Sequence, residues 1–306
     1  MTPAGVALPS TVRLRGVNMN PYFYDGVAPE LVWTEFWRRW DFNGWIKPMI
    51  DDAASIGTNA VRIFGNTNVV TSGAISLDEY LRRWKQVLDY VTAKNLYALP
   101  CGGDLSHWGR LTTRASAEQI YRAWAGLLSN YPRVVGVDVT NEASDQSQTT
   151  TPLSYSQPEP WLETIRTLGE ITRSASHKPI THSRAIRSKY SWRSGCVATD
   201  SLSDFLSIHC YYTPDPDDPV ALSQTPWGAG KELVLGEFGT DAGAPASEWQ
   251  ARYAAVVSLI ARSPARVGGL VWPTYDATPG ASSPFQSAGV SRSDVVASFA
   301  TLPTAR

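Results

Sequence analysis

Two glutamates, Glu142 and Glu237, each stand at the end of a short run of β-branched and aliphatic residues. The runs are VVGVDVT and LVLG, and runs of this kind predict buried strands. A pair of carboxyl groups can cleave a glycosidic bond, with about 5 to 5.5 Å between them for retention of configuration and about 6.5 to 9.5 Å for inversion. Either glutamate alone would more simply be a solvated loop residue. The pair therefore indicates this chemistry only if the two strands bring the carboxyl groups together.

Side chains alternate along a strand, which predicts the direction of each residue in these two runs. The inward face of the first run should carry Gly136, Asp138, Thr140 and, just past the strand, Glu142. The opposite face, expected beneath helices, should carry Val135, Val137 and Val139. In the second run Leu233, Leu235 and Glu237 should share one face. Both glutamates are thereby predicted at one rim of a common sheet.

Strand-like runs alternate with helical patterns along the chain, which is typical of repeated βα units around a parallel sheet. Eight strands are expected, at 13–18, 59–64, 96–100, 134–140, 179–183, 205–211, 233–237 and 267–272. Helices are expected at about 48–57, 77–94, 116–129, 161–176, 247–262 and 291–300, the third with a capping box of Ser116 and Gln119. Eight units of this kind fit an α/β fold, a (β/α)8 TIM barrel. The helices after the fifth and sixth strands are weakly marked, so a doubly wound sheet stays open.

Composition narrows the class of ligand. The 306 residues carry 27 basic and 28 acidic side chains, so no basic excess exists to bind nucleic acid or an anionic membrane. No stretch of about 18 apolar residues predicts a membrane span. No linker divides the chain, so residues 13–306 are expected to form one catalytic domain after an N-terminal extension at 1–12. Twelve tryptophans suit a flat, partly apolar ligand such as a sugar ring.

Neither cysteines nor histidines have the spacing of a metal site. The three cysteines (Cys101, Cys196 and Cys210) contain no CxxC pair, which leaves at most one disulfide. Of the four histidines, His177 and His182 flank the fifth expected strand and are interpreted as structural. The sequence lacks GxSxG, Walker A, GxGxxG and HExxH motifs. We expect no metal and no cofactor.

Five segments fall at the ends of the second, fourth, sixth, seventh and eighth expected strands. They are NAVRIF with Arg62, VVGVDVTNEA with Asn141 and Glu142, SIHCYY with His209 and Tyr211, LVLGEFG with Glu237, and GGLVWP with Trp272. As an ordered set across 13–275 they resemble the clan A glycoside hydrolases, particularly the cellulase-like family 5 group. The third strand departs from that pattern, because it ends in Cys101, Gly102 and Gly103 where many members carry a histidine.

The resemblance implies a retaining β-glycoside hydrolase acting on a glucan- or mannan-like polysaccharide or oligosaccharide. It implies that Glu142 is the general acid/base and Glu237 the nucleophile. Arg62 and Tyr211 would keep Glu237 ionised. The other implied contacts are Asn141 to the sugar 2-hydroxyl, His209 to the acid/base region or the sugar, and Trp272 beneath the ring.

Further substrate or supporting contacts are expected from Asn18, Tyr22 and Trp108, with Asp104 and His107 as weaker candidates. The segment 21–45 holds nine aromatic residues among twenty-five and is expected to form a substrate wall. Within it, Trp33, Phe36, Trp37 and Trp40 have helical spacing and more simply form the core face of a helix. The aromatic residues better placed to contact a ligand are Phe23, Trp45, Trp192 and Trp227.

Two alternatives stay open at this point. One is a carbohydrate-binding or adhesion protein that kept the barrel and lost turnover, although both glutamates are present. The other is an exo-acting glycosidase, whereas the loop lengths favour an open cleft and endo action. A monomer is expected. The first ten residues show no signal peptide, so the compartment is undecided, with secretion or a cell-surface location expected if such a peptide was removed.

Overall fold

The computed structural model describes residues 13–20, 27, 31–103, 113–143, 158–186, 197–215, 218, 230–240, 244–263, 267–271, 284–287 and 289–304. Its main sheet holds nine strands: β1 (Arg15–Asn18), β2 (Ala60–Phe64), β3 (Tyr97–Cys101), β4 (Val137–Asp138), β5 (Ile180–Thr181), β6 (Arg184–Ile186), β7 (Leu206–Cys210), β8 (Leu233–Phe238) and β9 (Val267–Val271). Their order is β5-β4-β3-β2-β1-β9-β8-β7-β6, and all pairings are parallel.

The sheet closes on itself because its two terminal strands, β5 and β6, are separated by only two residues of chain. β5 lies within the fifth strand expected at 179–183, whereas β6 begins one residue beyond its expected end, and together they take the place of the fifth barrel strand. β5 pairs with β4, and β6 pairs with β7. The protein is therefore an α/β (β/α)8 barrel, as predicted, and the doubly wound alternative is wrong.

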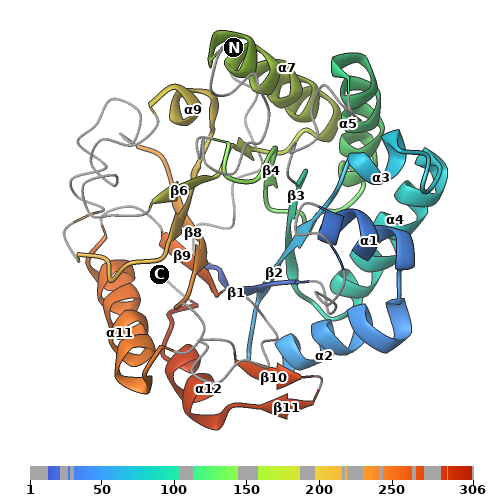
Figure 1. Cartoon of the computed structure of the whole chain (residues 1–306). Coiled ribbons are helices and arrows are strands. Elements are labelled where there is room, and N and C mark those ends of the chain that lie inside the picture. Colours follow the sequence, from blue (N-terminus) through green and yellow to red (C-terminus); the bar gives the residue numbers. More distant parts are fainter. Residues whose placement is uncertain are drawn as a thin grey trace.

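Helices surround the sheet (Figure 1). They are α1 (Val32–Arg39), α2 (Lys47–Ser55), α3 (Asn68–Thr71), α4 (Leu77–Ala93), α5 (Arg114–Leu128), α7 (Pro158–Ser176), α9 (Val197–Leu202), α11 (Ala246–Arg262) and α12 (Ser293–Ala300), with a π-helical turn, η2 (Phe42–Ile46), before α2. A small hairpin of β10 (Phe285–Ser287) and β11 (Val290–Ser291) lies beside α12 (Figure 1). None of the described helices is long and apolar enough to cross a bilayer.

The capping box of α5 differs from the prediction. Thr113 is the N-cap, and its side chain accepts from the backbone N–H of Ser116, whose hydroxyl in turn accepts from the Thr113 N–H. The helix therefore begins two residues earlier than expected, and Gln119 lies inside it. Serine can fill the third helical position because its hydroxyl reaches back to the cap as a glutamine side chain would.

The hydrophobic core has two layers. The larger cluster lies between the sheet and the helices and includes Val137 and Val139 of β4. The smaller cluster draws side chains from strands on every side, so it fills the barrel interior: Leu14, Ala60, Leu99, Val135, Phe205, Val234 and Leu270. The prediction that Val135 faces the helices is wrong, because regular strand structure in β4 begins only at Val137. This interior layer is the apolar floor beneath the polar residues of the upper barrel.

The aromatic residues of α1 form a core face, as their spacing predicts. Trp37 is fully buried and stacks against Trp40, with ring centroids 4.8 Å apart. Its indole N–H donates to the Phe64 carbonyl at the end of β2, with 2.9 Å between the heavy atoms. Trp33 stacks on the Phe64 ring at 4.5 Å. Trp45, expected as a ligand contact, is partly buried against the same core and donates to the Asn20 carbonyl. These aromatic contacts anchor the segment after β1 to the barrel.

His182, in the two-residue link between β5 and β6, gives the fold an acid-sensitive point. The side chain is buried under α7, and neither ring nitrogen has a hydrogen-bond partner among the described residues. Burial lowers the pKa of His182 to about 4, against a partial opposing effect of Asp138. Between pH 6.5 and 4 the unfolded chain therefore binds a proton that the folded chain does not, and stability falls as the pH falls through this window.

We expect His182→Leu to remove this part of the acid sensitivity. When the pH is lowered from 7 to 5, the free energy of unfolding should fall by about 2 kcal/mol less in the variant than in wild type. Urea denaturation followed by circular dichroism at both pH values measures the change. The matched control is His177→Asn, at an exposed histidine with a φ of 57° that asparagine tolerates. Equal pH dependence in wild type and His182→Leu would show that another group is responsible.

Candidate active site

A β-bulge in β8 aims Glu237 into the barrel. The pairing of β7 with β8 runs from Ile208 opposite Leu235 to His209 opposite Glu237, so Gly236 is the extra residue. Leu235 lies in the helix-facing cluster, and the prediction that it shares a face with Glu237 is wrong. Without the bulge, strict alternation would place Glu237 beneath the helices with Leu235. A Cβ at position 236 would lie 2.3 Å from the Ser207 hydroxyl, which explains the glycine.

Arg62 of β2 holds the Glu237 carboxylate. Its side chain is fully buried, and Nη1 donates to Glu237 Oε1 at 2.7 Å and to Asn18 Oδ1 at 3.0 Å. Asn18 in turn donates from Nδ2 to the Gly236 carbonyl at 2.8 Å, which ties β1 to the bulge of β8. Asn18 therefore contacts Glu237 indirectly, through Arg62 and through the backbone of the bulge.

The second nitrogen of Arg62 faces the opposite wall of the barrel. Nη2 donates to Asp138 Oδ2 at 2.7 Å and to Asn141 Oδ1 at 2.8 Å, and Cys101 Sγ lies 3.5 Å away. Cys101 occupies a position where many family 5 glycoside hydrolases carry a histidine, and its Sγ accepts from Arg62. Burial by itself disfavours the guanidinium charge, but interactions with Cys101, Asp138 and Glu237 raise the pKa of Arg62 above its usual value. Arg62 is therefore a permanent cation between two carboxylates.

Tyr211, just beyond β7, contacts the other oxygen of the same glutamate. Its hydroxyl donates to Glu237 Oε2. Burial and the nearby negative charge of Glu237 raise the pKa of Tyr211 well above its ordinary value, so the phenol stays protonated and donates. Arg252 of α11 donates to the carbonyls of Tyr211 and Gly239, and so links the segments that follow β7 and β8.

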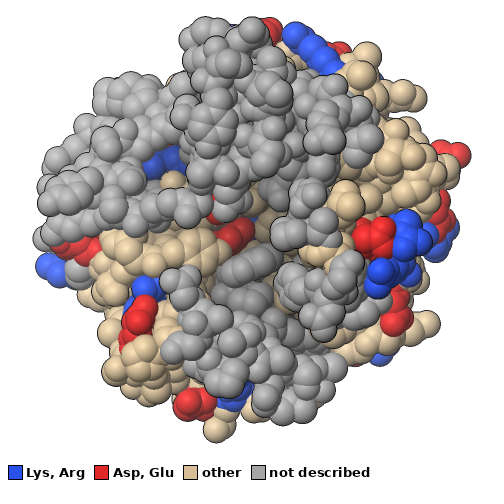
Figure 2. All heavy atoms as spheres, in the orientation of Figure 1, with Lys and Arg blue, Asp and Glu red and all other residues tan. Residues whose placement is uncertain are grey.

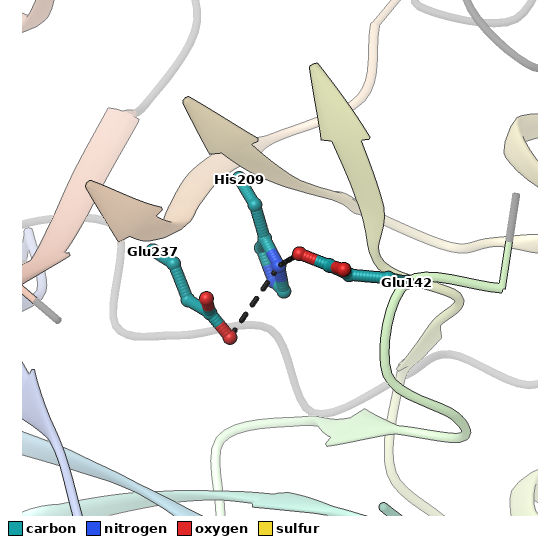
Figure 3. Close-up of side chains that lie close together, drawn as sticks. All are labelled: Glu142, His209 and Glu237. Atoms are coloured by element: carbon teal, nitrogen blue, oxygen red, sulfur yellow. Dashed lines mark hydrogen bonds and ion pairs between the residues drawn. The ribbon is translucent and has the colours of Figure 1, made fainter. Parts of the chain in front are cut away.

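Glu142 approaches from the turn after β4, and His209 of β7 lies between it and Glu237 (Figure 3). His209 Nδ1 is 2.9 Å from Glu142 Oε1 and 3.4 Å from Glu237 Oε1. Burial lowers the pKa of His209 to about 4, with Glu237 opposing and Arg62 adding to the shift. The imidazole is therefore neutral near pH 7. The backbone of Glu142 has a φ of 46°, a left-handed conformation unusual for a residue with a Cβ.

The structure brings seven of the predicted site residues together. The residues brought together are Asn18, Arg62, Asn141, Glu142, His209, Tyr211 and Glu237. Tyr22, Trp108 and Trp272 lie outside the described residues, as do Phe23, Asp104, His107, Trp192, Cys196 and Trp227. Acidic side-chain atoms are visible near the middle of the face that Figure 2 presents, at the end of the barrel.

Three contributors were missed. Asp138 was predicted to point inward but was given no role, although a charged residue inside a strand calls for a buried partner. Ser183 accepts from the backbone N–H of Glu142, and Arg252 donates to the backbone carbonyl of Tyr211. Nothing in the sequence around either residue predicts such a contact.

Glu142, His209 and Glu237 each offer a ligand atom within 4.8 Å of the others, a spacing that a metal ion could bridge. However, Glu237 Oε1 already accepts from the Arg62 guanidinium at 2.7 Å, whose charge would repel a cation bound at that oxygen. The arrangement suits proton transfer and nucleophilic attack better than metal binding.

No protein-family model matches the sequence, and no curated protein matches it. Solved structures do, and they are glycoside hydrolases of family 5. These likenesses show that the chain has the clan A, cellulase-like (β/α)8 barrel fold of that family.

Three of the similar structures illustrate this. The exo-β-1,4-mannosidase Op5Man5 from an Opitutaceae bacterium has a TM-score of 0.66 and 18% identity, covering 99% of this chain. The chain spans only 61% of the length of that mannosidase. A variant of a GH5_18 protein from Streptomyces cattleya, in complex with Manβ1-4GlcNAc, has a TM-score of 0.62 and 16% identity over 85% of this chain and 71% of its own. A broad-specificity GH5-4 endoglucanase from Clostridium longisporum has a TM-score of 0.64 and 14% identity over 94% of both chains.

Proposed function

We propose that the protein is a retaining β-glycoside hydrolase that cleaves β-linked glucan- or mannan-like chains, with Glu237 as nucleophile and Glu142 as general acid/base. The observation that carries this proposal is the short distance between the two carboxylates, since one oxygen of each lies within 4.8 Å of the other. So close an approach of one oxygen of each carboxylate supports the shorter carboxyl separation of retaining enzymes over the roughly 6.5 to 9.5 Å of inverting ones.

In the first step Glu237 attacks the anomeric carbon, and the bond from that carbon to the departing oxygen breaks as Glu142 delivers a proton to the oxygen. Arg62 and Tyr211 each donate to a different oxygen of Glu237, so the carboxyl group is fixed in orientation before attack. The neutral His209 orients Glu142 without adding a positive charge that would favour loss of its proton.

In the second step water attacks the glycosyl ester, Glu142 removes the proton from that water, and Glu237 leaves as a carboxylate. The same Glu142 thus changes from acid to base because the negative charge on Glu237 is consumed while the ester exists. Arg62 donates to Asn141 Oδ1 and so holds this side chain near the nucleophile, where the family resemblance implies a contact with the sugar 2-hydroxyl. Glucose- and mannose-containing substrates are supported by the similar structures, which include an exo-mannosidase, a Manβ1-4GlcNAc complex and an endoglucanase.

The deciding experiment follows hydrolysis by proton NMR. The wild-type protein is incubated with β-glucans, β-mannans and aryl β-glucosides and β-mannosides, and the anomeric signals are recorded before mutarotation. We expect the β-anomer of the product to appear first. First appearance of the α-anomer would indicate inversion and reject the nucleophile assignment. If no substrate is cleaved, binding of the same glycans by calorimetry would favour the carbohydrate-binding alternative. The chain length of the first products separates endo from exo action.

A further inference from the structure

Asp138 is a buried carboxylate whose two oxygens have different partners. It lies on the inward face of β4 with no exposed surface. Oδ2 accepts from Arg62 Nη2 at 2.7 Å, and Oδ1 accepts from the backbone N–H of Ser183 at 3.0 Å. A buried charge of this kind is retained only where it is paired and hydrogen-bonded, and both conditions are met here.

The first contact leads to the nucleophile. Arg62 Nη2 bonds Asp138 while Nη1 bonds Glu237, so the planar guanidinium spans the barrel between the two carboxylates. Loss of the Asp138 charge would leave the buried guanidinium with Glu237 as its remaining carboxylate partner in the described structure. The position of Arg62 and the strength of its hold on Glu237 therefore depend on Asp138.

The second contact leads to the acid/base. Ser183 Oγ accepts from the backbone N–H of Glu142 at 3.0 Å, and the Ser183 carbonyl accepts from the N–H of Ala143 at 2.8 Å. These two bonds hold the turn in which Glu142 has its left-handed φ of 46°. Such a conformation persists only when surrounding contacts impose it. Ser183 is in turn fixed by its own N–H donated to Asp138.

We propose that Asp138 is a positioning residue that aligns both catalytic glutamates at once, through Arg62 for Glu237 and through Ser183 for Glu142. The inference rests on the proposed function, because it takes Glu237 as nucleophile and Glu142 as acid/base. In this proposal Ser183 positions Glu142 and has no effect on Glu237. Ser183 lies in the break between β5 and β6, where its backbone N–H can donate to the Asp138 side chain of β4 instead of to the backbone of a neighbouring strand.

The test compares kcat/KM for aryl β-glycosides with good and poor leaving groups, because kcat/KM reports the first bond-breaking step. Ser183→Ala should lower kcat/KM at least tenfold for poor leaving groups and less than threefold for the best ones, which need no proton from Glu142. Asp138→Asn should lower kcat/KM at least tenfold for the best leaving groups, because Arg62 and Glu237 are disturbed. It should lower kcat/KM by at least a further tenfold for poor leaving groups, because an amide cannot accept from both Arg62 and the Ser183 N–H and Glu142 is disturbed as well. A merely structural defect would lower kcat/KM by the same factor for all substrates in both variants.

Matched controls exist outside the site. Asp200 is buried and paired with Arg184 at 3.0 Å, so Asp200→Asn breaks a similar ion pair, and Ser176→Ala removes a buried serine hydroxyl from α7. Both should leave the leaving-group dependence as in wild type. If Asp138→Asn does not fold, Ser183→Ala and Ser183→Thr carry the test. The threonine hydroxyl should restore the wild-type dependence.

The two proposals fail in different ways. If wild type hydrolyses the glycosides but neither variant shows the expected pattern, the role of Asp138 is rejected and the glycosidase stands. If wild type cleaves nothing, the proposed function is rejected, and crystal structures of the variants decide the inference without turnover. Displacement of Arg62 in Asp138→Asn, and a changed backbone at Glu142 in both variants, would support the positioning role. Unchanged positions would overturn it.

Discussion

Glu237→Gln is expected to lower kcat/KM by roughly 10⁴-fold or more while the barrel stays folded. The amide oxygen carries no charge with which to attack the anomeric carbon. The volume is conserved, and Tyr211 can rotate its hydroxyl to accept from the new amide while Arg62 still donates to the amide oxygen. Substrate binding should therefore persist.

Release of reducing sugar measures the rate, calorimetry with an oligosaccharide measures binding, and circular dichroism checks the fold. Glu163→Gln, an exposed glutamate on α7, is the matched control and should have wild-type activity. Turnover by Glu237→Gln within tenfold of wild type would show that another group attacks the sugar. Loss of binding together with loss of turnover would instead point to a disturbed site, and Glu237→Asp would then separate charge from shape.

The sequence predicts the rim of the barrel better than its interior geometry. Strand ends can be located from runs of β-branched residues, so Arg62, Glu142, His209 and Glu237 are all assigned to one end of a sheet. The inward direction of Glu237 was predicted for the wrong reason, because alternation alone groups it with Leu235. The bulge at Gly236 corrects this direction, and a bulge depends on pairing with β7, which local sequence does not encode.

The contacts that the sequence does not predict share a physical cause. Ser183 can bond Glu142 and Asp138 because it lies in the break between β5 and β6. Arg252 can bond the Tyr211 and Gly239 carbonyls because α11 packs beside the ends of β7 and β8. Both residues bond backbone groups that are remote in the chain, so no spacing rule applies to them. The expected stacking contacts of Tyr22, Trp108 and Trp272 fall outside the described residues and stay predictions.

Three charged side chains are buried together at the carboxyl end of the barrel, and their burial lowers the stability of the fold. Arg62, Asp138 and Glu237 are all nearly or fully buried, and desolvating each is offset only by their mutual pairing and hydrogen bonds. The apolar layer beneath them and the aromatic packing around Trp37 and Trp84 supply burial that compensates. A site of this kind favours chemistry over stability, because fixed charges in a dry interior act more strongly on a reacting group than charges in water do.

Removal of the Glu142 carboxylate gives the second large effect. Glu142→Ala should lower kcat/KM by about 10²-fold to 10⁴-fold for substrates with poor leaving groups and far less for activated aryl glycosides. The glycosyl ester on Glu237 would then accumulate, because no base activates water. Alanine retains the strained left-handed backbone at this position, whereas Glu142→Gly relieves it, so the two variants separate the loss of the carboxylate from backbone strain.

Azide tests the role of Glu142 directly. In Glu142→Ala the small anion can occupy the space of the missing carboxylate and attack the glycosyl ester without a base, so turnover should rise and the product should be the β-glycosyl azide. In Glu237→Ala azide would instead enter on the opposite face of the sugar and displace the leaving group while Glu142 protonates it, which gives the α-glycosyl azide. NMR of the two products thus assigns each glutamate to one face of the sugar. A β-azide from Glu237→Ala, or an α-azide from Glu142→Ala, would require the two roles to be exchanged.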